Sequence, residues 1–296
     1  MRTHERMHEE SGWIAAIPAV FVLLWSTAFI AGKLSTPYAT PMTFLTLRYA
    51  GATIILLAIA AITRAPWPRT WREVGHATVA ALFLHIAFVG GTLYAYRGGV
   101  EAGVAALIAS LQPLFTAVMV GPFLGESVSR RQWFGFVLGL VGVALVVWRK
   151  LAFGFGSFLG MSYAVVALAG ITIGTVYQKR FCSTMDVRTG NTIQFTAALV
   201  IAGVLSLFLE SQHVIWSSAF VISLAWMTIA ISVGALALLY FMIRHGAVAR
   251  VASLFYLVPP VTALIAWPLF GERFSHLGLV GLLLTVLGVA LARSEG

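Results

Sequence analysis

The last third of this chain repeats its second quarter at a constant offset of 146 residues. Between positions 93 and 145, 17 of the 53 residues return unchanged at that offset, without a gap. Pro113 returns as Pro259, and Glu126 returns as Glu272. A shared apolar composition would match scattered Leu, Val and Ala, but it would not bring prolines, glycines and scarce acidic residues into one register. The chain is therefore a tandem duplication, which limits the fold to two copies of one structural unit.

Composition places both copies in a lipid membrane. Hydrophobic residues make up 60% of the 296 positions and charged residues 10%, whereas soluble domains carry about 25% charged residues. The net charge of +9 could indicate nucleic-acid binding, but the basic residues stand in short segments between apolar runs and form no basic stripe. We therefore expect a multi-pass integral membrane protein of the bacterial inner membrane, surrounded by lipid and without a nucleic-acid partner.

Ten apolar runs divide the chain, each close to the ~20 residues that a helix needs to cross a bilayer. Continuous runs of this kind favour helices over a barrel, whose strands alternate in polarity. We expect an all-α membrane protein of ten transmembrane helices, with spans at about 14–34, 41–63, 74–95, 101–124, 131–148, 157–178, 189–209, 219–241, 248–270 and 276–292.

The charges of the loops predict how these helices are oriented. With the N-terminus in the cytoplasm, thirteen Lys and Arg residues lie on the cytoplasmic side and five lie outside, as the positive-inside rule requires. Both termini are then cytoplasmic. Each copy, 1–150 and 151–296, has five helices, so the second copy enters the membrane in the opposite sense to the first. Inverted repeats of this kind are typical of alternating-access carriers with a substrate site near the membrane midplane.

Several short motifs accompany this pattern, and they are Leu47-Arg48-Tyr49, Leu111-Gln112-Pro113, Gly125-Glu126, Gly135, Gly139-Leu140-Val141-Gly142, Pro259, Gly271-Glu272, Gly281 and Gly288. Together they resemble the EamA-type branch of the drug/metabolite transporter superfamily. The resemblance implies a ten-helix carrier in which the first four helices of each half surround a central cavity. Members mostly export amino acids and related metabolites, and the chain resembles the bacterial exporters of aromatic amino acids.

Two ionisable residues within the spans are candidates for the substrate site, because such groups are costly at this depth and are commonly functional. Arg48 lies roughly 10 Å into the second helix at 1.5 Å per residue, where it either pairs with carbonyl groups or binds a carboxylate. His85 lies in the middle of the third helix, where it either bonds a neighbouring helix or belongs to the site. The second copy has Gln194 and Ile231 at these positions. We therefore expect the substrate contacts where the two copies differ.

Aromatic and hydroxyl residues accompany these two on the inner helices. A cavity lined by rings, hydroxyls and one or two cationic groups suits an amphipathic zwitterion such as an aromatic or apolar amino acid. The tyrosines near span ends, at 94, 177 and 240, have an alternative role as anchors at the membrane interface. The further candidates for substrate binding are Trp25, Thr27, Thr92, Tyr94, Tyr163, Tyr177, Gln178, Tyr240 and Tyr256.

Two repeated residue types are candidates for hinges and gates. Pro113 and Pro259 fall within apolar runs, where a proline removes a backbone hydrogen bond and kinks a helix. We interpret them as hinges because they recur in both copies, and the alternative is a packing kink without substrate contact. Glu126 and Glu272 follow helix ends beside arginines. Each either hydrogen-bonds a helix N-terminus, where the dipole stabilises a carboxylate, or forms a gating salt bridge.

Glycines form small-residue faces on the fifth and tenth helices, at positions 135, 139 and 142 and at positions 278, 281 and 288. Such faces let two helices approach closely. They favour packing within the chain, and the alternative is a contact in a homodimer.

The sequence also narrows the function by what it lacks. Apart from Glu101, which starts the span at 101–124, no Asp or Glu lies within a predicted span. The absence of a carboxylate deep in the membrane argues against proton-coupled export of lipophilic cations or drugs. The alternative to a carrier of amino acids is an exporter of lipophilic cations or drugs, or of nucleotide-linked metabolites. The single cysteine, Cys182, excludes an internal disulfide and a paired-cysteine metal site. Because no HExxH or GxSxG motif is present, we expect a carrier without metal or cofactor rather than an enzyme.

Overall fold

The computed structural model describes residues 2–100, 105, 108–151, 157–270 and 276–293. These residues form helices joined by loops, and the one β contact among them is an isolated bridge between Ala39 and Val214. The predicted all-helical fold is therefore confirmed. The helices of the first copy are α1 (Arg2–Ser35), α2 (Pro41–Ile62), α3 (Trp71–Ala81), the π-helix η1 (Leu82–Gly90), α4 (Gly91–Arg97), α6 (Gln112–Leu124) and α7 (Arg130–Leu151). Those of the second copy are α8 (Phe158–Cys182), α9 (Val187–Leu209), α10 (Ser218–Trp226), the π-helix η2 (Met227–Ala235), α11 (Leu236–His245), α12 (Val248–Ala252), the 3₁₀-helix η3 (Ser253–Leu257), α13 (Val258–Phe270) and α14 (His276–Arg293).

Seven of the described helical segments are long and apolar enough to cross a membrane, and all seven coincide with predicted spans. Large apolar side chains such as Ile62, Phe158 and Phe208 are exposed, as expected where a helix faces lipid. The chain is thus an integral membrane protein with several spans. The seven segments are Ala16–Ser35, Pro41–Ile62, Trp71–Arg97, Phe158–Cys182, Val187–Leu209, Ser218–His245 and His276–Arg293, and Gln112–Leu124 and Val248–Thr262 are shorter apolar helices.

Local sequence explains where several helices begin and end. Pro41 lies in the first turn of α2, where its missing N–H group would have no helical partner in any case. Thr70 and Glu73 form a capping box at the start of α3. Gly125 ends α6 in the left-handed conformation, with φ of +69°, which glycine adopts without strain.

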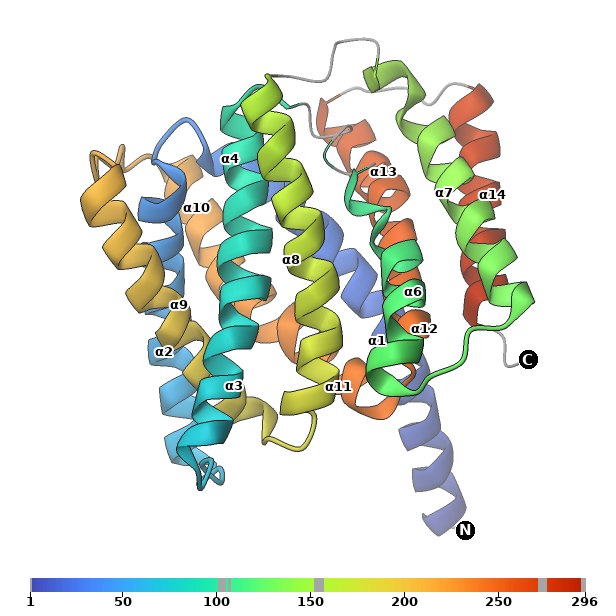
Figure 1. Ribbon diagram of the computed structural model, residues 1–296, viewed down its shortest axis with the longest axis horizontal. Helices are drawn as coiled ribbons and strands as arrows, with labels where there is room; N and C mark the ends of the chain where they lie inside the picture. The colour runs from blue at the N-terminus through green and yellow to red at the C-terminus, as the bar shows by residue number, and fades with distance from the viewer. Residues whose placement is uncertain (1, 101–104, 106–107, 152–156, 271–275, 294–296) are drawn as a thin grey trace.

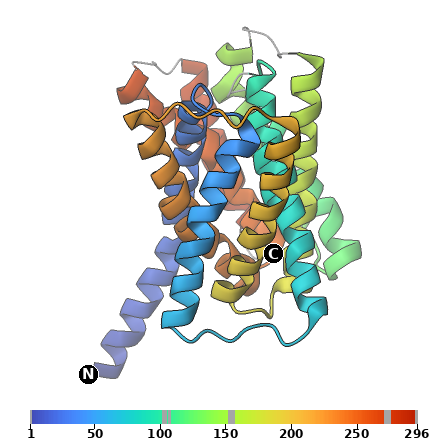
Figure 2. The ribbon, with the colours of Figure 1, turned by 90° about the vertical axis from the view of Figure 1, so that its left-hand side faces the viewer.

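The helices of the two copies run in opposite directions. In Figure 1, α1 rises from the lower end of the bundle, whereas its counterpart α8 descends from the upper end. α14 runs down to the lower end, so the first helix starts and the last helix ends on the same side. We name the two ends lower and upper as Figure 1 shows them. Figure 2 shows the loop after α9 beside the loop between α1 and α2 at the upper end, where the Ile215 N–H donates to the Tyr38 carbonyl oxygen.

The helices α7 and α14 lie side by side at one edge of the bundle (Figure 1). Their glycines face each other. A Cβ atom on Gly135 would come within 2.6 Å of the Gly288 carbonyl oxygen, and one on Gly142 within 2.6 Å of that of Gly281. The close packing predicted for these faces is thus made within the chain. These four glycines are covered by the facing helix of the same chain, and a homodimer contact of the two helices stays a prediction.

The third helix of each copy contains a π-helical segment, η1 or η2, at nearly the same place in the repeat. The residue pattern did not predict them. A side-chain hydroxyl binds a carbonyl oxygen in each segment: Tyr49 of α2 donates to the His85 carbonyl at 2.9 Å, and Ser232 of η2 itself donates to the Met227 carbonyl at 3.0 Å. π-helical turns are rare and often mark functional sites.

Pro113 and Pro259 each lie in the first turn of a helix that follows a break. A turn at residues 110–111 precedes α6, and the 3₁₀-helix η3 precedes α13. The prediction of a kink inside a continuous helix is therefore wrong in detail. Each proline starts a new segment, because its fixed φ suits the first turn and its missing N–H is not needed there. The role of these breaks as hinges stays a prediction.

Candidate functional site

A cavity lies in the middle of the bundle, between α1, α2, α8 and the two π-containing helices. The unfilled space in and around it comes to about 680 Å³, part of which is open to the outside. Most of its lining is apolar, and Arg48, His85, Thr92 and Tyr96 supply the polar groups. The full lining is Trp25, Ala28, Phe29, Gly32, Arg48, Leu84, His85, Phe88, Val89, Thr92, Leu93, Tyr96, Ile171, Met227, Ile231, Leu236 and Leu239.

Arg48 is the cationic group of this cavity, and only 2% of its surface is exposed. Its Nε donates to the Ser232 hydroxyl at 2.8 Å. That hydroxyl in turn donates to the Met227 carbonyl inside η2, so the guanidinium of the first copy is fixed by the π segment of the second. The central carbon of the Arg48 guanidinium, Cζ, also lies 5.8 Å from the centre of the Tyr49 ring. An arginine at this depth is costly unless it is paired, and these contacts satisfy only part of its five donors.

His85 lies beside Arg48 in the cavity wall, within η1, and 1% of its surface is exposed. Its ring packs between Phe195, at 4.5 Å between ring centres, and Tyr49, at 5.6 Å. Among the described residues, none forms a hydrogen bond with its Nε2 atom. The Gln194 side chain lies close enough to interact with this imidazole. A buried polar atom without a hydrogen bond is costly, so a ligand that reaches Nε2 would gain from bonding to it.

Aromatic rings form another part of the lining, and Phe255 and Phe21 pack behind it. Trp25 lies parallel to Phe88, with an angle of 3° between the planes and 6.3 Å between the ring centres. Phe255 meets the edge of Trp25 at 5.4 Å and that of Phe21 at 5.5 Å. This wall offers flat apolar surface to a ring or an aliphatic group of a cargo. The arrangement joins an apolar wall to one cation in a single cavity.

The structure brings together four of the residues proposed for substrate binding, Trp25, Arg48, His85 and Thr92, in this cavity. The Thr92 hydroxyl donates to the Phe88 carbonyl. Signals of helix depth and helix face were enough to place these four residues on one cavity.

Other predicted binding residues have partners elsewhere. Thr27 accepts a hydrogen bond from the Trp226 indole at 2.8 Å. Tyr94 stacks on Tyr163 near the upper end, with 5.1 Å between the ring centres. Tyr256 is fully buried against Gly139.

Tyr177 lies at the lower part of α8, where its hydroxyl is 2.7 Å from the His76 Nδ1. It also packs on Phe181, with 4.6 Å between ring centres. These contacts tie α8 to α3 outside the cavity lining.

A chain of amides lies closer to the lower end than the cavity. The Tyr240 hydroxyl donates to the Gln194 Oε1 at 2.8 Å, and the Gln194 Nε2 donates to the Gln178 Oε1 at 3.0 Å. These residues line a second, smaller cavity together with Asn191, whose side-chain amide has no hydrogen-bond partner among the described residues. Gln194 occupies the position that matches Arg48 in the repeat. The two copies therefore place a cation in one half of the bundle and a neutral amide in the other.

Glu210, which falls between the spans predicted at 189–209 and 219–241, holds the upper end together. Its carboxylate accepts hydrogen bonds from the Thr40 hydroxyl at 2.5 Å and from the N–H groups of Met42 and Thr43 at 3.0 and 2.8 Å. It also accepts from the Tyr94 hydroxyl at 2.7 Å. Burial alone would raise the pKa of Glu210, but the hydrogen bonds from Thr40, Met42, Tyr94 and Thr43 outweigh it and lower the pKa. Its partners lie on another helix, so no local signal identified it.

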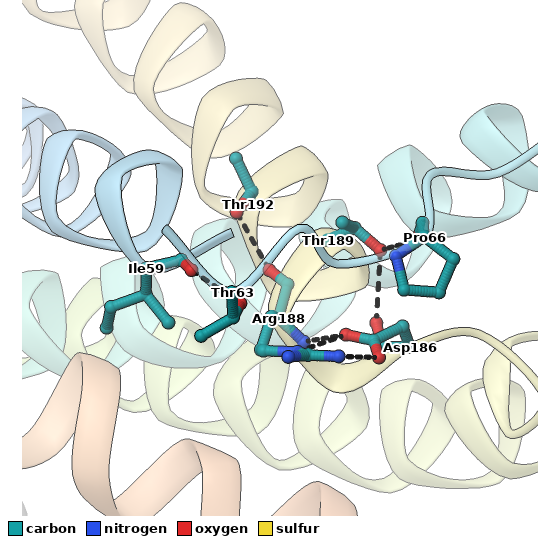
Figure 3. Close-up of polar contacts among 7 residues, drawn as sticks. All are labelled: Ile59, Thr63, Pro66, Asp186, Arg188, Thr189 and Thr192. Atoms are coloured by element: carbon teal, nitrogen blue, oxygen red, sulfur yellow. Dashed lines mark hydrogen bonds and ion pairs between the residues drawn. The ribbon is translucent and has the colours of Figure 1, made fainter. Parts of the chain in front are cut away.

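The lower end has the matching junction, and Figure 3 shows its contacts. Asp186 caps its own helix, α9, and pairs with Arg188 at 2.7 Å. The hydrogen bond from the Arg188 side chain holds the pKa of Asp186 below its usual value. The Thr189 hydroxyl donates to the Pro66 carbonyl at 2.8 Å and so links α9 to the loop after α2.

Glu126 accepts a hydrogen bond from the N–H of Val248, the first residue of α12, at 3.0 Å. This is the helix N-terminal contact that the sequence predicted for it. Its counterpart Glu272 lies outside the described residues.

Two segments of the chain, residues 12–148 and 158–294, each match the EamA-like transporter family. An uncharacterized transporter of Bacillus subtilis, YvbV, is 26% identical over 287 residues, which cover 95% of this chain and 92% of that protein. A probable amino-acid metabolite efflux pump of Salmonella typhimurium is 25% identical over 298 residues, covering 96% and 94%. A crystal structure of a protein that is 18% identical has a TM-score of 0.77 and covers 93% of this chain and 95% of its own. At this identity it shows a shared fold alone.

Proposed function

The chain belongs to the EamA-like transporter family, and we propose that it is a secondary carrier that exports amino acids with aromatic or apolar side chains and related small metabolites. It moves them by alternating access around the central cavity and catalyses no reaction. Ten helices cross the inner membrane of a bacterium, with both termini in the cytoplasm, so the lower end of the bundle is cytoplasmic and the upper end is external.

The observation that carries this proposal is that Arg48 lines one cavity together with aromatic rings. A guanidinium matches a carboxylate with two parallel hydrogen bonds. Trp25 and Phe88 offer ring faces to an apolar side chain in the same cavity. An amphipathic metabolite with a carboxylate at one end and an apolar body at the other fits both features.

Two further observations support the cargo and the mechanism. The Salmonella typhimurium relative, which matches nearly the whole chain, is named a probable amino-acid metabolite efflux pump. The two copies run in opposite directions (Figure 1), and each has a π segment and a proline-headed helix at matching places. Paired irregular segments beside a cavity are suited to an exchange between two states.

A lipophilic cation is a poorer cargo. Arg48 would repel it, and among the described residues that line the cavity no carboxylate is present to bind it. The cavity is also small and apolar for a nucleotide-linked metabolite, whose phosphates need several basic partners.

Transport by the purified full-length protein in liposomes tests the proposal. We expect saturable counterflow of phenylalanine, leucine or a related metabolite from a panel of amino acids and nucleosides. Arg48→Ala should lower kcat/KM at least tenfold and His85→Ala several-fold. Arg72→Ala, which removes an exposed arginine from α3, is the matched control and should transport normally. Folded protein without saturable flux of any panel member would contradict the proposal.

A further inference from the structure

We infer that the cavity selects its cargo by charge: it prefers a carboxylate with an apolar body and no ammonium group, such as a 2-oxo acid or an N-acylated amino acid, over the zwitterionic amino acid of the same body. This inference rests on the proposed transport function and names its substrate class.

The first step is the charge balance of the cavity. Arg48 is the one residue with a fixed charge among the described residues that line it. No Asp or Glu within the described part of the chain belongs to the lining. Glu210 and Asp186, the carboxylates at the two ends of α9, lie outside the cavity lining, and both accept hydrogen bonds at the helix ends. The cavity can neutralise a negative charge, and it has no counter-charge for a positive one.

The second step is the geometry of the guanidinium. Its Nε is occupied by Ser232, whose own proton goes to the Met227 carbonyl. No hydrogen bond within the described residues uses the Nη atoms of Arg48, so four N–H donors remain. Ser232 holds the planar group in one orientation, which leaves the Nη edge for a carboxylate with two oxygen atoms.

The third step is His85. Its Nε2 is buried in the wall of the same cavity and has no partner among the described residues. This nitrogen can meet a second oxygen of the cargo, such as the carbonyl of a 2-oxo acid or of an N-acyl group. Two polar groups, both suited to oxygen, therefore face one cavity.

The fourth step is the cost of an ammonium group. In an α-amino acid, the ammonium lies only a few ångströms from the carboxylate, so a cargo held by Arg48 brings its positive charge close to the guanidinium. Hydroxyl oxygens and ring faces are the acceptors that remain, and they compensate a buried charge less well than a carboxylate does. Removing or acylating the amino group removes this cost. A reaction that deaminates or acylates an amino acid would supply such a cargo.

A matched set of compounds with one phenyl body tests the inference: phenylpyruvate and N-acetylphenylalanine as anions, phenylalanine as the zwitterion and phenethylamine as the cation. Full-length protein in liposomes should transport the anions with kcat/KM at least tenfold higher than phenylalanine, and should show no saturable flux of phenethylamine. Flux of phenylalanine equal to or above that of both anions would overturn the inference while leaving the transport function intact. The absence of saturable flux for all four compounds would overturn the inference, and only the additional absence of flux for every member of the amino-acid and nucleoside panel would overturn the transport function itself.

Variants of Arg48 and Ser232 test the assigned residues. Arg48→Gln should reduce the anion preference from at least tenfold to near one, and Ser232→Ala, which only frees the guanidinium, should reduce it partly. Arg72→Gln, at an exposed arginine, should keep the full preference. A preference that survives Arg48→Gln would overturn the assignment.

Binding measured by thermal stabilisation in detergent gives a second readout that needs no transport. N-acetylphenylalanine should raise the midpoint of unfolding of the natural protein and of Arg72→Gln, and should not raise that of Ser232→Ala to the same extent. If Arg48→Gln does not fold, Ser232→Ala carries the test, and an equal shift in Ser232→Ala and the natural protein would count against the inference.

Discussion

The two ends of the α2–α9 pair use the same positions of the repeat in different ways. At the upper end, the start of α2 is capped by a carboxylate from the other copy, Glu210. At the lower end, the start of α9 is capped by its own Asp186. Thr40 and Asp186 are equivalent positions in the repeat. The cap of α9 is therefore local, whereas the cap of α2 is a bond between the two copies.

The equivalent tyrosines show the same contrast. Tyr94 donates to the charged Glu210 at the upper end, whereas Tyr240 donates to the neutral amide of Gln194. Opening the upper end must therefore break the charge-assisted hydrogen bonds of Glu210, which join the two copies. The Tyr240–Gln194 bond joins two uncharged groups within the second copy, and at the lower end the charge-assisted contact between the copies is the one from the Val248 N–H to Glu126. Both junctions contain a carboxylate whose pKa is lowered, but only Glu210 links the two copies, so acid should weaken the contact between the copies at the upper end and a local helix cap at the lower end.

The largest effect is expected from Glu210→Ala. This change leaves the Tyr94 hydroxyl and the N–H groups of Met42 and Thr43 without their acceptor, and we expect a loss of about 3 kcal/mol of unfolding free energy. Asp186→Ala removes a local cap that also binds Arg188, and it should cost only about 1 kcal/mol. Thermal unfolding in one detergent compares the two variants. Equal losses would mean that the upper carboxylate is no more than a helix cap.

A smaller difference is expected between the two tyrosines. Tyr240→Phe leaves the buried Gln194 oxygen without its donor and should cost about 1.5 kcal/mol. Tyr94→Phe leaves Glu210 with its donors on α2 and should cost about 0.5 kcal/mol, because the half-exposed carboxylate can also meet water. Urea or thermal unfolding of both variants shows which one loses more unfolding free energy. A larger loss for Tyr94→Phe would reverse the comparison.

The smallest effect is the pH dependence of the upper junction. The pKa of Glu210 is lowered in the folded protein, so its stabilisation is present above the unfolded pKa of about 4.3 and is lost as pH falls through the folded pKa. We expect roughly 1 kcal/mol of acid-dependent stability from this group. Unfolding midpoints measured from pH 6 down to pH 3 should fall less steeply in Glu210→Gln than in the natural protein. Parallel curves would show that another group causes the acid sensitivity.

Some features of the site could be predicted from sequence. Arg48 and His85 stood out because an ionisable residue deep in an apolar run is rare and costly, whatever its neighbours are. The helical period then placed Thr92 and the aromatic stripe on the face of His85. Glu126 was predictable for a similar reason, since a carboxylate just past a helix end has few stable roles other than meeting another helix end.

Other features had no sequence signal. Ser232 is one of many hydroxyl residues in apolar runs, and only the approach of α2 to η2 makes it the partner of Arg48. Glu210 looked like an ordinary loop residue because its donors are about 170 positions away in the chain. The two π segments lack a distinctive pattern, as the same residues would also form an α-helix.

The sequence by itself determined the membrane environment, the duplication, the helical class and the depth of each polar residue. These follow from composition and from periodicity, which act along the chain. Only the tertiary structure decided which faces meet: the glycines of α7 on those of α14, Ser232 on Arg48 and Glu210 on the start of α2. In a membrane, the apolar face of a helix has little preference for another helix over the surrounding lipid chains. Close packing and single hydrogen bonds between distant residues therefore decide which helix faces meet. No local stretch of sequence predicts these pairings.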